Sequence, residues 1–171
     1  MGLKMGTVTL EEYNPIWIKE FETEKEALEN VFGNYAVAIE HVGSTAIPGL
    51  TSKPIIDIAV GVEYLESIPF FKDMFSSCLD YSVKEDSVDG EVLVVKRLDE
   101  DTTTHLIHIM ELDADRYNDT ILFRDYIINN LEELNRYEKL KKELAVIYAD
   151  NRKMYTNSKN EFIKEIISKA K

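Results

Sequence analysis

The sequence predicts an α/β protein, with α+β as the alternative: a small mixed β-sheet flanked by helices, followed by a helical C-terminal third. Apolar runs typical of strands dominate the middle of the chain, and the hydrophobic period becomes helical from about residue 117 to the end. The 171 residues contain no repeat or linker, and this length suits one domain with a sizeable core. We expect a single domain over residues 1–171, with the sheet over about 35–112 and C-terminal helices over about 117–171.

The first part of the chain contains one predicted helix and two predicted strands. Residues 14–32 have Asn14 as a possible N-cap, Pro15 in the first turn and apolar residues at helical spacing. Residues 35–42 and 54–62 are apolar runs of strand length, and the second reads as the more deeply buried.

The remaining elements follow in order. Ser67 and Pro69 open a predicted helix that runs to Cys78. Three strands are predicted next, at residues 81–85, 91–97 and 104–112. The first two form a hairpin around Asp89-Gly90, a dipeptide typical of tight turns. Three helices complete the chain, marked by apolar residues within 122–127, 131–147 and 162–167.

The composition argues against several classes of protein. A net charge of −12 argues against a broad nucleic-acid surface, which needs basic residues. No apolar run approaches the roughly 20 residues of a membrane span, and the first residues lack the apolar stretch of a signal peptide. The single cysteine excludes an internal disulfide and a multi-cysteine zinc site. We expect a cytoplasmic protein that binds no membrane and no extended nucleic acid, with room for a local basic pocket.

Residues 39–60 carry most of the functional information. One apolar run ends at Gly43-Ser44, and the next is broken by a single carboxylate, Asp57. A Gly-Ser turn after a strand can direct backbone N–H groups at a phosphate. A carboxylate inside a strand is costly unless it is paired, hydrogen-bonded or bound to a metal. The alternative is structural, with Asp57 capping a turn or pairing with Lys53.

The second carboxylate of a phosphoryl-transfer site is missing. Two carboxylates at positions i and i+2 of a strand would reach the same pair of divalent cations, but Ala59 occupies the second position. Polar residues on neighbouring strands are the candidates to complete the site: Glu40, His41, His105, His108 and Glu111. Alternation places His105 and His108 on opposite faces, so we expect only one of them to reach Asp57. A structural role in the core remains the alternative for each histidine.

Residues 39–57 resemble the GrpB family, whose pattern runs close to I-E-H-V-G-S-T-A-V-P-G-L-x-x-K-P-I-I-D. The stretch His105-Leu106-Ile107-His108 is similar to the H-x-L-H element of that family. A later similar segment begins Leu122-Phe123-Arg124-Asp125-Tyr126-Ile127 and continues through Tyr137, Leu140-Lys141 and Leu144-Ala145 to Tyr155 and Lys159. The resemblance covers nearly the whole chain.

This resemblance implies a nucleotidyltransferase-like fold. In that superfamily the Gly-Ser turn holds nucleotide phosphates, and two carboxylates on the next strand, often with a third on a later strand, hold magnesium. Gly43, Ser44 and Asp57 match this arrangement and Ala59 does not, a departure that the GrpB pattern shares.

Three functions follow as hypotheses. The first is a nucleotidyl- or phosphoryl-transferase that uses Mg²⁺ or Mn²⁺ and a small-molecule acceptor. The second is a non-catalytic module that binds a nucleotide or another phosphorylated small molecule. The third is a metal-dependent hydrolase that uses His105, His108 and Asp57. The oligomeric state does not follow from these residues.

The residues predicted for these functions fall into three groups. The predicted phosphate-binding residues are Gly43, Ser44, Thr45, Lys53, Arg124 and Lys159. The predicted catalytic residues are Asp57, with His108 or Glu40 as base or further ligand, and the predicted metal ligands are Asp57, His105 and His108. Surface ion pairs are the alternative role for Arg124 and Lys159.

Overall fold

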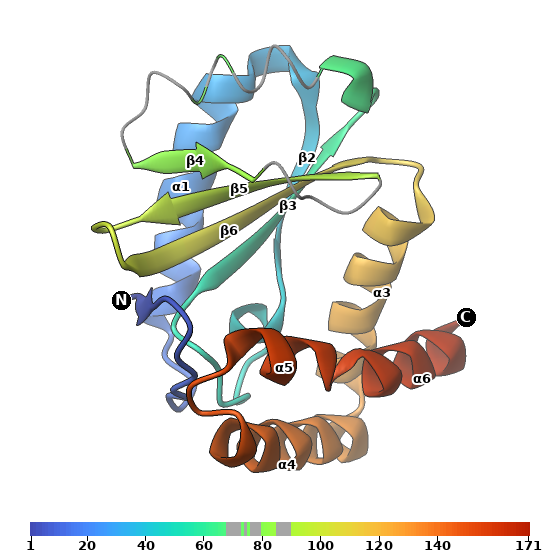
Figure 1. Ribbon diagram of the computed structural model, residues 1–171. Helices are drawn as coiled ribbons and strands as arrows, with labels where there is room; N and C mark the ends of the chain where they lie inside the picture. Colours follow the sequence, from blue (N-terminus) through green and yellow to red (C-terminus); the bar gives the residue numbers. More distant parts are fainter. Residues whose placement is uncertain (68–72, 74, 76–79, 85–89) are drawn as a thin grey trace.

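The fold is a mixed six-stranded sheet with helices on both faces (Figure 1). This computed structural model describes residues 1–67, 73, 75, 80–84 and 90–171. The strands are β1 (Leu3–Lys4), β2 (Ala36–Val42), β3 (Ile56–Val62), β4 (Tyr81–Val83), β5 (Glu91–Arg97) and β6 (Thr102–Glu111). They are ordered β2-β3-β6-β5-β4, and β1 pairs with the start of β6. The neighbours β3 and β6 are parallel, and the other pairs of named strands are antiparallel.

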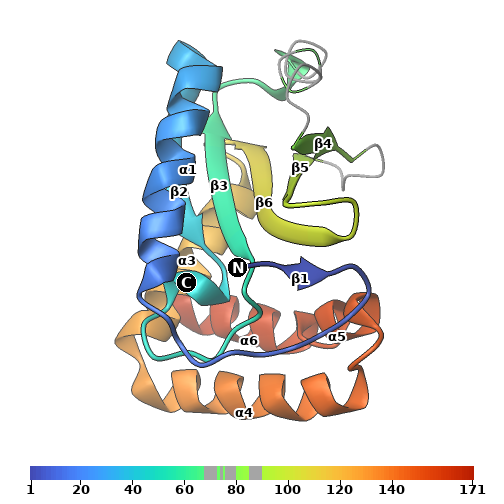
Figure 2. The same ribbon diagram turned by 90° about the vertical axis from the view of Figure 1, so that its left-hand side faces the viewer.

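The helices enclose the sheet and close one end of the molecule (Figures 1 and 2). They are α1 (Ile16–Phe32), α3 (Asp115–Asn129), α4 (Leu131–Ile147), α5 (Arg152–Asn157) and α6 (Asn160–Ala170). The first covers one face of the sheet, α3 lies over the other, and the last three pack together beyond one end of the strands. The predicted mixed α/β fold with a helical C-terminal third is confirmed.

Local chemistry sets the limits of α1. The backbone N–H of Ile16 donates to the side-chain oxygen of Asn14 at 3.0 Å, so Asn14 satisfies a donor at the start of the helix. Gly33 ends the helix with φ +53°, a conformation that favours glycine. The apolar side of α1 includes Trp17 and Phe21 and packs against one face of β3.

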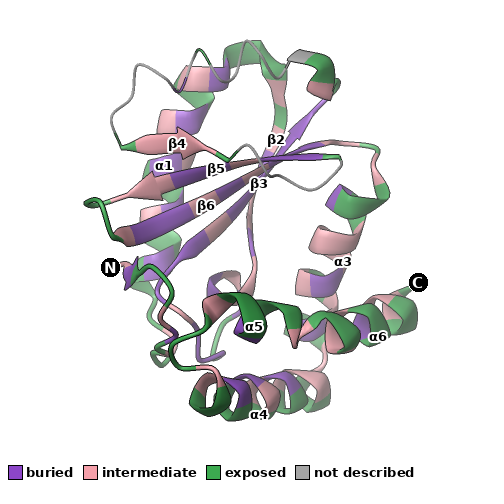
Figure 3. Ribbon diagram, in the orientation of Figure 1, coloured by how far each residue is buried: buried purple, intermediate pink, exposed green. Residues whose placement is uncertain are grey.

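Alternation along β3 separates a core face from a functional face. Ile56, Ile58 and Val60 are buried with the apolar side of α1 (Figure 3). Asp57 and Ala59 face the opposite side, where Ala59 packs near α3. The strand β3 therefore supplies apolar side chains to the core from one face and the carboxylate of Asp57 to the functional face.

The C-terminal helices form a second core under the sheet. Ile47 and Leu50, from the loop between β2 and β3, are buried with Phe123, Tyr137 and other residues of α3, α4 and α6. This packing fixes the loop that follows Gly43 and Ser44. Across the described ranges, no helix is long and apolar enough to span a membrane.

Some elements differ from the predictions. The short elements β1 and α5 were not predicted, because runs of two and six residues carry little periodicity. Leu131 and Ile147 mark the limits of α4 but are exposed, whereas Lys141 is buried in it. Most of the helix predicted over 67–78, including Cys78, and Asp89 of the predicted turn lie outside the described residues.

Candidate functional site

A cavity of about 570 Å³ lies between the functional face of the sheet and the C-terminal helices. Its polar lining includes Ser44, Asp57, Glu91, His108, Arg116 and Lys159, and its apolar lining includes Met110, Phe123, Ile163 and Ile167. These residues come from the β2–β3 loop, three strands, α3 and the α5–α6 region. The cavity thus joins parts of the chain that are distant in the sequence.

Gly43 brings the turn after β2 into contact with Asp57. The last residue of β2, Val42, pairs with Asp57 in the sheet, and Gly43 follows with φ +69°. A Cβ atom on Gly43 would lie 2.3 Å from Oδ2 of Asp57. Glycine is therefore needed here both for its backbone conformation and for the close approach. The following Ser44–Ala46 segment is a single 3₁₀ turn.

The side chain of Thr45 stabilises this turn by contacts with β2 and with the residue before β3. Its buried hydroxyl lies 3.0 Å from Nε2 of His41 and 3.4 Å from the carbonyl oxygen of Ile55. His41 in turn stacks on Phe21 of α1, with ring centroids 4.8 Å apart. Burial lowers the pKa of His41 to about 4, so the ring is neutral at pH 7. The Thr45 side chain thus connects the turn to the core, and Thr45, predicted to bind phosphate, is not among the described residues that line the cavity.

Asp57, His108 and Glu91 form a chain of alternating charges that ends at Arg116. Nε2 of His108 lies 3.7 Å from Asp57, and Nδ1 lies 2.5 Å from Glu91. The second oxygen of Glu91 accepts a hydrogen bond from Nε of Arg116 at 2.5 Å. The side chains of Asp57 and His108 are about one-quarter to one-third exposed (30% and 26%), whereas that of Glu91 is 5% exposed. The buried carboxylate is thus held between two cations.

The two carboxylates hold a proton on His108. Burial alone would lower the pKa of His108, but hydrogen bonds and charges from Asp57 and Glu91 raise it to about 9. Burial would raise the pKa of both carboxyl groups, but His108 lowers each of them below its usual value. At pH 7 the ring is an imidazolium between two carboxylates. This state suits a cation or a general acid rather than the predicted general base.

The residues present do not fit a magnesium pair. Ala59 faces the same side as Asp57 and pairs with His108 on β6. The side chain next to Ala59, where the second carboxylate would be, is therefore the imidazolium of His108. Its positive charge repels a metal ion. In the described ranges, no group of three His, Cys, Asp or Glu side chains could hold a metal ion. We therefore assign no chemical step to a divalent metal.

His105 lies on the core face of the sheet, so the structure does not bring it together with Asp57 and His108, the other two predicted metal ligands. Its partner in β3 is Ile56, on the core face, and burial lowers its pKa. Its Nδ1 lies 3.0 Å from the hydroxyl of Thr104. Alternation sends neighbouring odd and even positions of β6 to opposite faces, so only His108 reaches Asp57.

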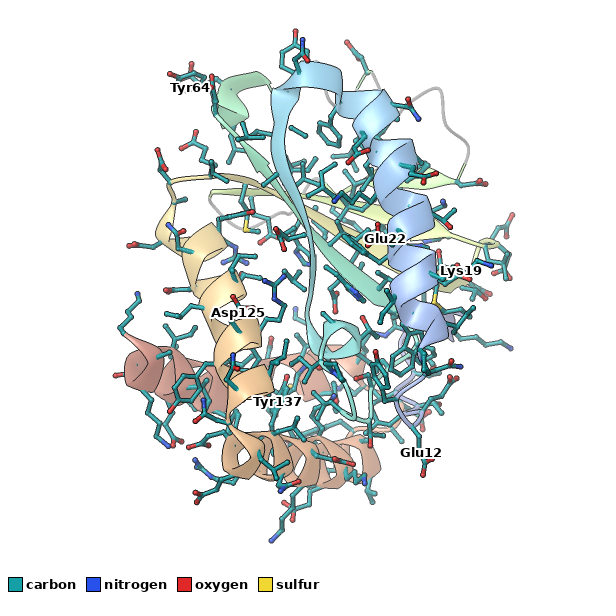
Figure 4. All side chains as sticks on the ribbon, turned by 180° about the vertical axis from the view of Figure 1, so that it is seen from behind. Glu12, Lys19, Glu22, Tyr64, Asp125 and Tyr137 are labelled. Atoms are coloured by element: carbon teal, nitrogen blue, oxygen red, sulfur yellow. The ribbon has the colours of Figure 1, made fainter. Side chains whose placement is uncertain are left out.

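Arg124 and Glu40 pair with each other at the edge of the sheet. A guanidinium NH of Arg124 donates to Glu40 and to the carbonyl oxygen of His41, both at 2.8 Å. Its Nε donates to Asp125, labelled on α3 in Figure 4, at 2.7 Å. Neither Arg124 nor Glu40 is among the described residues that line the cavity. The ion pair joins α3 to β2, and the structure does not bring these two residues together with the predicted site residues that line the cavity.

Two of the predicted lysines interact with each other and with Asp57. Lys159 lines the cavity, whereas Lys53, in the loop before β3, has its Nζ 5.4 Å from the ring centroid of Tyr155. Burial and the charge of Lys159 lower the pKa of Lys53 to about 8, while Asp57 opposes this shift. Of the predicted phosphate-binding residues, the structure brings Gly43, Ser44 and Lys159 together, with Lys53 beside them.

Sequence reasoning missed Glu91, Arg116 and Lys141. Glu91 opens a strand and Arg116 lies in the first turn of α3, positions where charged residues are common. Lys141 was quoted only as part of a family pattern, yet it is 1% exposed. Its position among the buried residues Tyr137 and Leu144 on α4 was the available signal.

Comparisons with known proteins agree with this picture. Residues 7–169 match the GrpB protein family. The chain is 37% identical to the glutamate-rich protein GrpB of Alkalihalophilus pseudofirmus over 98% of both chains. It is 32% identical to the UPF0157 protein BH1888 of Halalkalibacterium halodurans, covering 96% of this chain and 83% of that one. The crystal structure of GrpB from Enterococcus faecalis superposes with a TM-score of 0.84 at 32% identity, covering 95% of this chain and 96% of that one. None of these names states a reaction, and the chain belongs to the GrpB family.

Proposed function

We propose that the cavity binds a nucleotide or another phosphorylated small molecule. The observation that carries this proposal is that Gly43, Ser44 and Lys159 line the same cavity. Backbone N–H groups, a hydroxyl and an ammonium group are donors that phosphate oxygens accept readily. Tyr137 of α4 lines the same cavity, and burial raises its pKa to about 12 while the nearby Ser44 side chain opposes this shift.

The cavity also has room for an uncharged part of the ligand. Its volume of about 570 Å³ falls within the roughly 300–1,000 Å³ usual for small-molecule sites. Phe123, Ile163 and Ile167 give it an apolar wall between α3 and α6. A molecule with a charged phosphate end and an apolar or ring-shaped end matches both walls.

Phosphoryl or nucleotidyl transfer is a second candidate, favoured by the charge chain at His108. Its Nδ1 is held by Glu91, which leaves the Nε2–H directed toward Asp57 and the cavity. A fixed imidazolium beside a phosphate stabilises the negative charge that develops during transfer. It can also donate a proton to the leaving group.

A thermal-shift screen tests binding. The protein is melted with nucleoside triphosphates and with small phosphorylated metabolites, in EDTA and in Mg²⁺ or Mn²⁺. A ligand at about 100 times its Kd stabilises the folded state by about 2.7 kcal/mol, which corresponds to several degrees for a protein of this size. Release of phosphate or pyrophosphate in the same samples reports transfer. No stabilisation by any of these ligands in either condition would reject the proposal.

Asp57→Asn distinguishes ligand binding without a metal from ligand binding through a metal held by Asp57. The substitution removes a negative charge next to the proposed phosphate position, so we expect stronger stabilisation by nucleotides in EDTA. If Asp57 instead binds a metal, the metal-dependent part of the stabilisation disappears. Asp150→Asn, at an exposed turn between α4 and α5, is the matched control. It should change neither the stabilisation by nucleotides in EDTA nor the metal-dependent part of the stabilisation.

A further inference from the structure

Three lysines from distant parts of the chain act electrostatically on one another or on Asp57, and one of them, Lys159, lines the cavity. Lys53 precedes β3, Lys141 lies within α4, and Lys159 lies just before α6. The charges of Lys53 and Lys159 both act on Lys141, and that of Lys159 acts on Lys53. Asp57 favours the charged form of all three. This is a local concentration of positive charge in a protein whose net charge is −12.

These amines are not neutralised by ion pairs. In the part of the chain that the structure describes, the lysines that form ion pairs are others: Lys96, Lys142, Lys164, Lys169 and Lys171. The three amines lie instead against aromatic rings. Nζ of Lys159 is 4.9 Å from the ring centroid of Tyr155, which it shares with Lys53, and Nζ of Lys141 is 5.2 Å from that of Tyr137. A ring positions an ammonium group without cancelling its charge.

Lys141 is the most deeply buried of the three. Its Nζ donates to the carbonyl oxygen of Thr51 and, at 3.3 Å, to the hydroxyl of Ser52. Burial, followed by repulsion from Lys159 and Lys53, lowers its pKa well below the usual value. An anion placed among the three amines would reverse this repulsion and favour their charged forms.

A buried hydroxyl lies beside the same group. Tyr155 is 0% exposed, and its hydroxyl has no hydrogen-bond partner among the described residues. Its pKa is raised by burial and by interaction with Tyr137, which lines the cavity. A buried hydroxyl without an acceptor is unfavourable, and an anionic oxygen is a suitable acceptor.

We propose that Lys53, Lys141 and Lys159 form a subsite for a diphosphate or triphosphate group that binds without a divalent metal. This inference rests on the proposed function and names its ligand class. The negative charge of such a group is greater than one ammonium can balance, and three amines match it. Ala59 occupies the position of a second metal-binding carboxylate and the imidazolium of His108 lies next to it, so the lysines supply the positive charge that a metal would otherwise supply.

Binding of inorganic tripolyphosphate in EDTA tests the subsite by isothermal titration calorimetry. We expect wild-type protein to bind it, and Lys53→Met and Lys159→Met each to weaken binding about tenfold or more. Lys164→Met is the matched control, because Lys164 is an exposed residue of the neighbouring helix that pairs with Glu161. Its affinity should stay within about twofold of wild type. Equal affinity in wild type and in the Lys53 and Lys159 variants would overturn the subsite.

A second measurement uses wild-type protein alone, because Lys141 is buried and its replacement by Met would remove hydrogen bonds that support the fold. Acetylation of lysines by acetic anhydride is followed by mass spectrometry with and without tripolyphosphate in EDTA. We expect protection of Lys53 and Lys159 and no protection of Lys164. Absence of protection would count against the subsite even if every variant folded poorly.

The two proposals fail in different ways. If nucleotides bind only with Mg²⁺ and tripolyphosphate does not bind in EDTA, the metal-independent subsite is wrong and the proposed function stands. If tripolyphosphate binds through the lysines but no nucleotide or phosphorylated metabolite stabilises the protein, the proposed function is wrong.

Discussion

Replacing His108 with Gln measures the strength of the charge chain at the site. The pKa of His108 is raised from 6.5 to about 9 in the folded protein. A raised pKa adds stability that is fully present below the unfolded value and is lost as the pH rises through the folded value. The stabilising effect of the ring is therefore complete below about pH 6.5 and gone above about pH 9.

The size of this effect follows from the shift. The interval between 6.5 and about 9, at about 1.4 kcal/mol per pH unit, corresponds to roughly 3 kcal/mol. The ring is 26% exposed, so water screens part of the interaction, and we expect about 2 kcal/mol. Asp57 and Glu91 share this energy, because each holds the same imidazolium.

Urea denaturation of wild type and His108→Gln between about pH 6 and about pH 10 is the assay. Wild type alone is insufficient, because the lowered pKa of Lys53, about 8, adds stability as the pH rises through this range. That contribution cancels in the difference between the two proteins. We expect the difference in free energy of unfolding to be largest near pH 6 and to narrow by about 2 kcal/mol by pH 10.

His41→Gln is the control for loss of a histidine. The pKa of His41 is lowered to about 4, so its ring is neutral above about pH 7 whether the chain is folded or unfolded. The difference in free energy of unfolding between His41→Gln and wild type should therefore stay constant from about pH 7 to about pH 10. A His108→Gln difference that is equally constant from pH 6 to pH 10 would refute the imidazolium between two carboxylates.

Three further predictions concern the turn and the carboxylate. Gly43→Ala should lower stability by about 1–3 kcal/mol more than Gly49→Ala, because both glycines have positive φ but only Gly43 would place a Cβ against Asp57; thermal melts of both variants check this. Asp57→Asn should lower the pKa of His108 below about 9, read from its ring resonances in an NMR titration, and an unchanged pKa would contradict the pairing. Thr45→Val should cost about 1–2 kcal/mol by removing a buried hydroxyl that bonds on two sides, and a urea melt indistinguishable from wild type would show that the hydroxyl is dispensable.

Several features followed from local sequence because their causes are local. The period of apolar residues predicted α1, β3 and the C-terminal helices, since each must bury one side of itself. Alternation predicted that His105 and His108 would face opposite sides, since side chains of a strand alternate whatever its neighbours are. The Gly43-Ser44 turn and Asp57 were recognised together because a glycine and a carboxylate are unusual in apolar runs.

Other features depended on how distant elements pack. Glu91 reaches His108 only through the register in which β5 pairs Glu91 with Met110 and Leu93 with His108. Lys141 reaches Thr51 only because α4 packs beneath the β2–β3 loop. Likewise, the pairing of Arg124 with Glu40 depends on where α3 crosses β2.

The sequence by itself therefore determined the elements, the faces of the strands and the turn beside Asp57. The tertiary structure alone decided which charges act on one another there: an imidazolium between two carboxylates, and three lysines that repel one another, one of which lines the cavity. The physical reason is that alternation and periodicity act within one element. The electrostatic state of a buried group is instead set by side chains brought within a few ångströms by the packing of the whole chain.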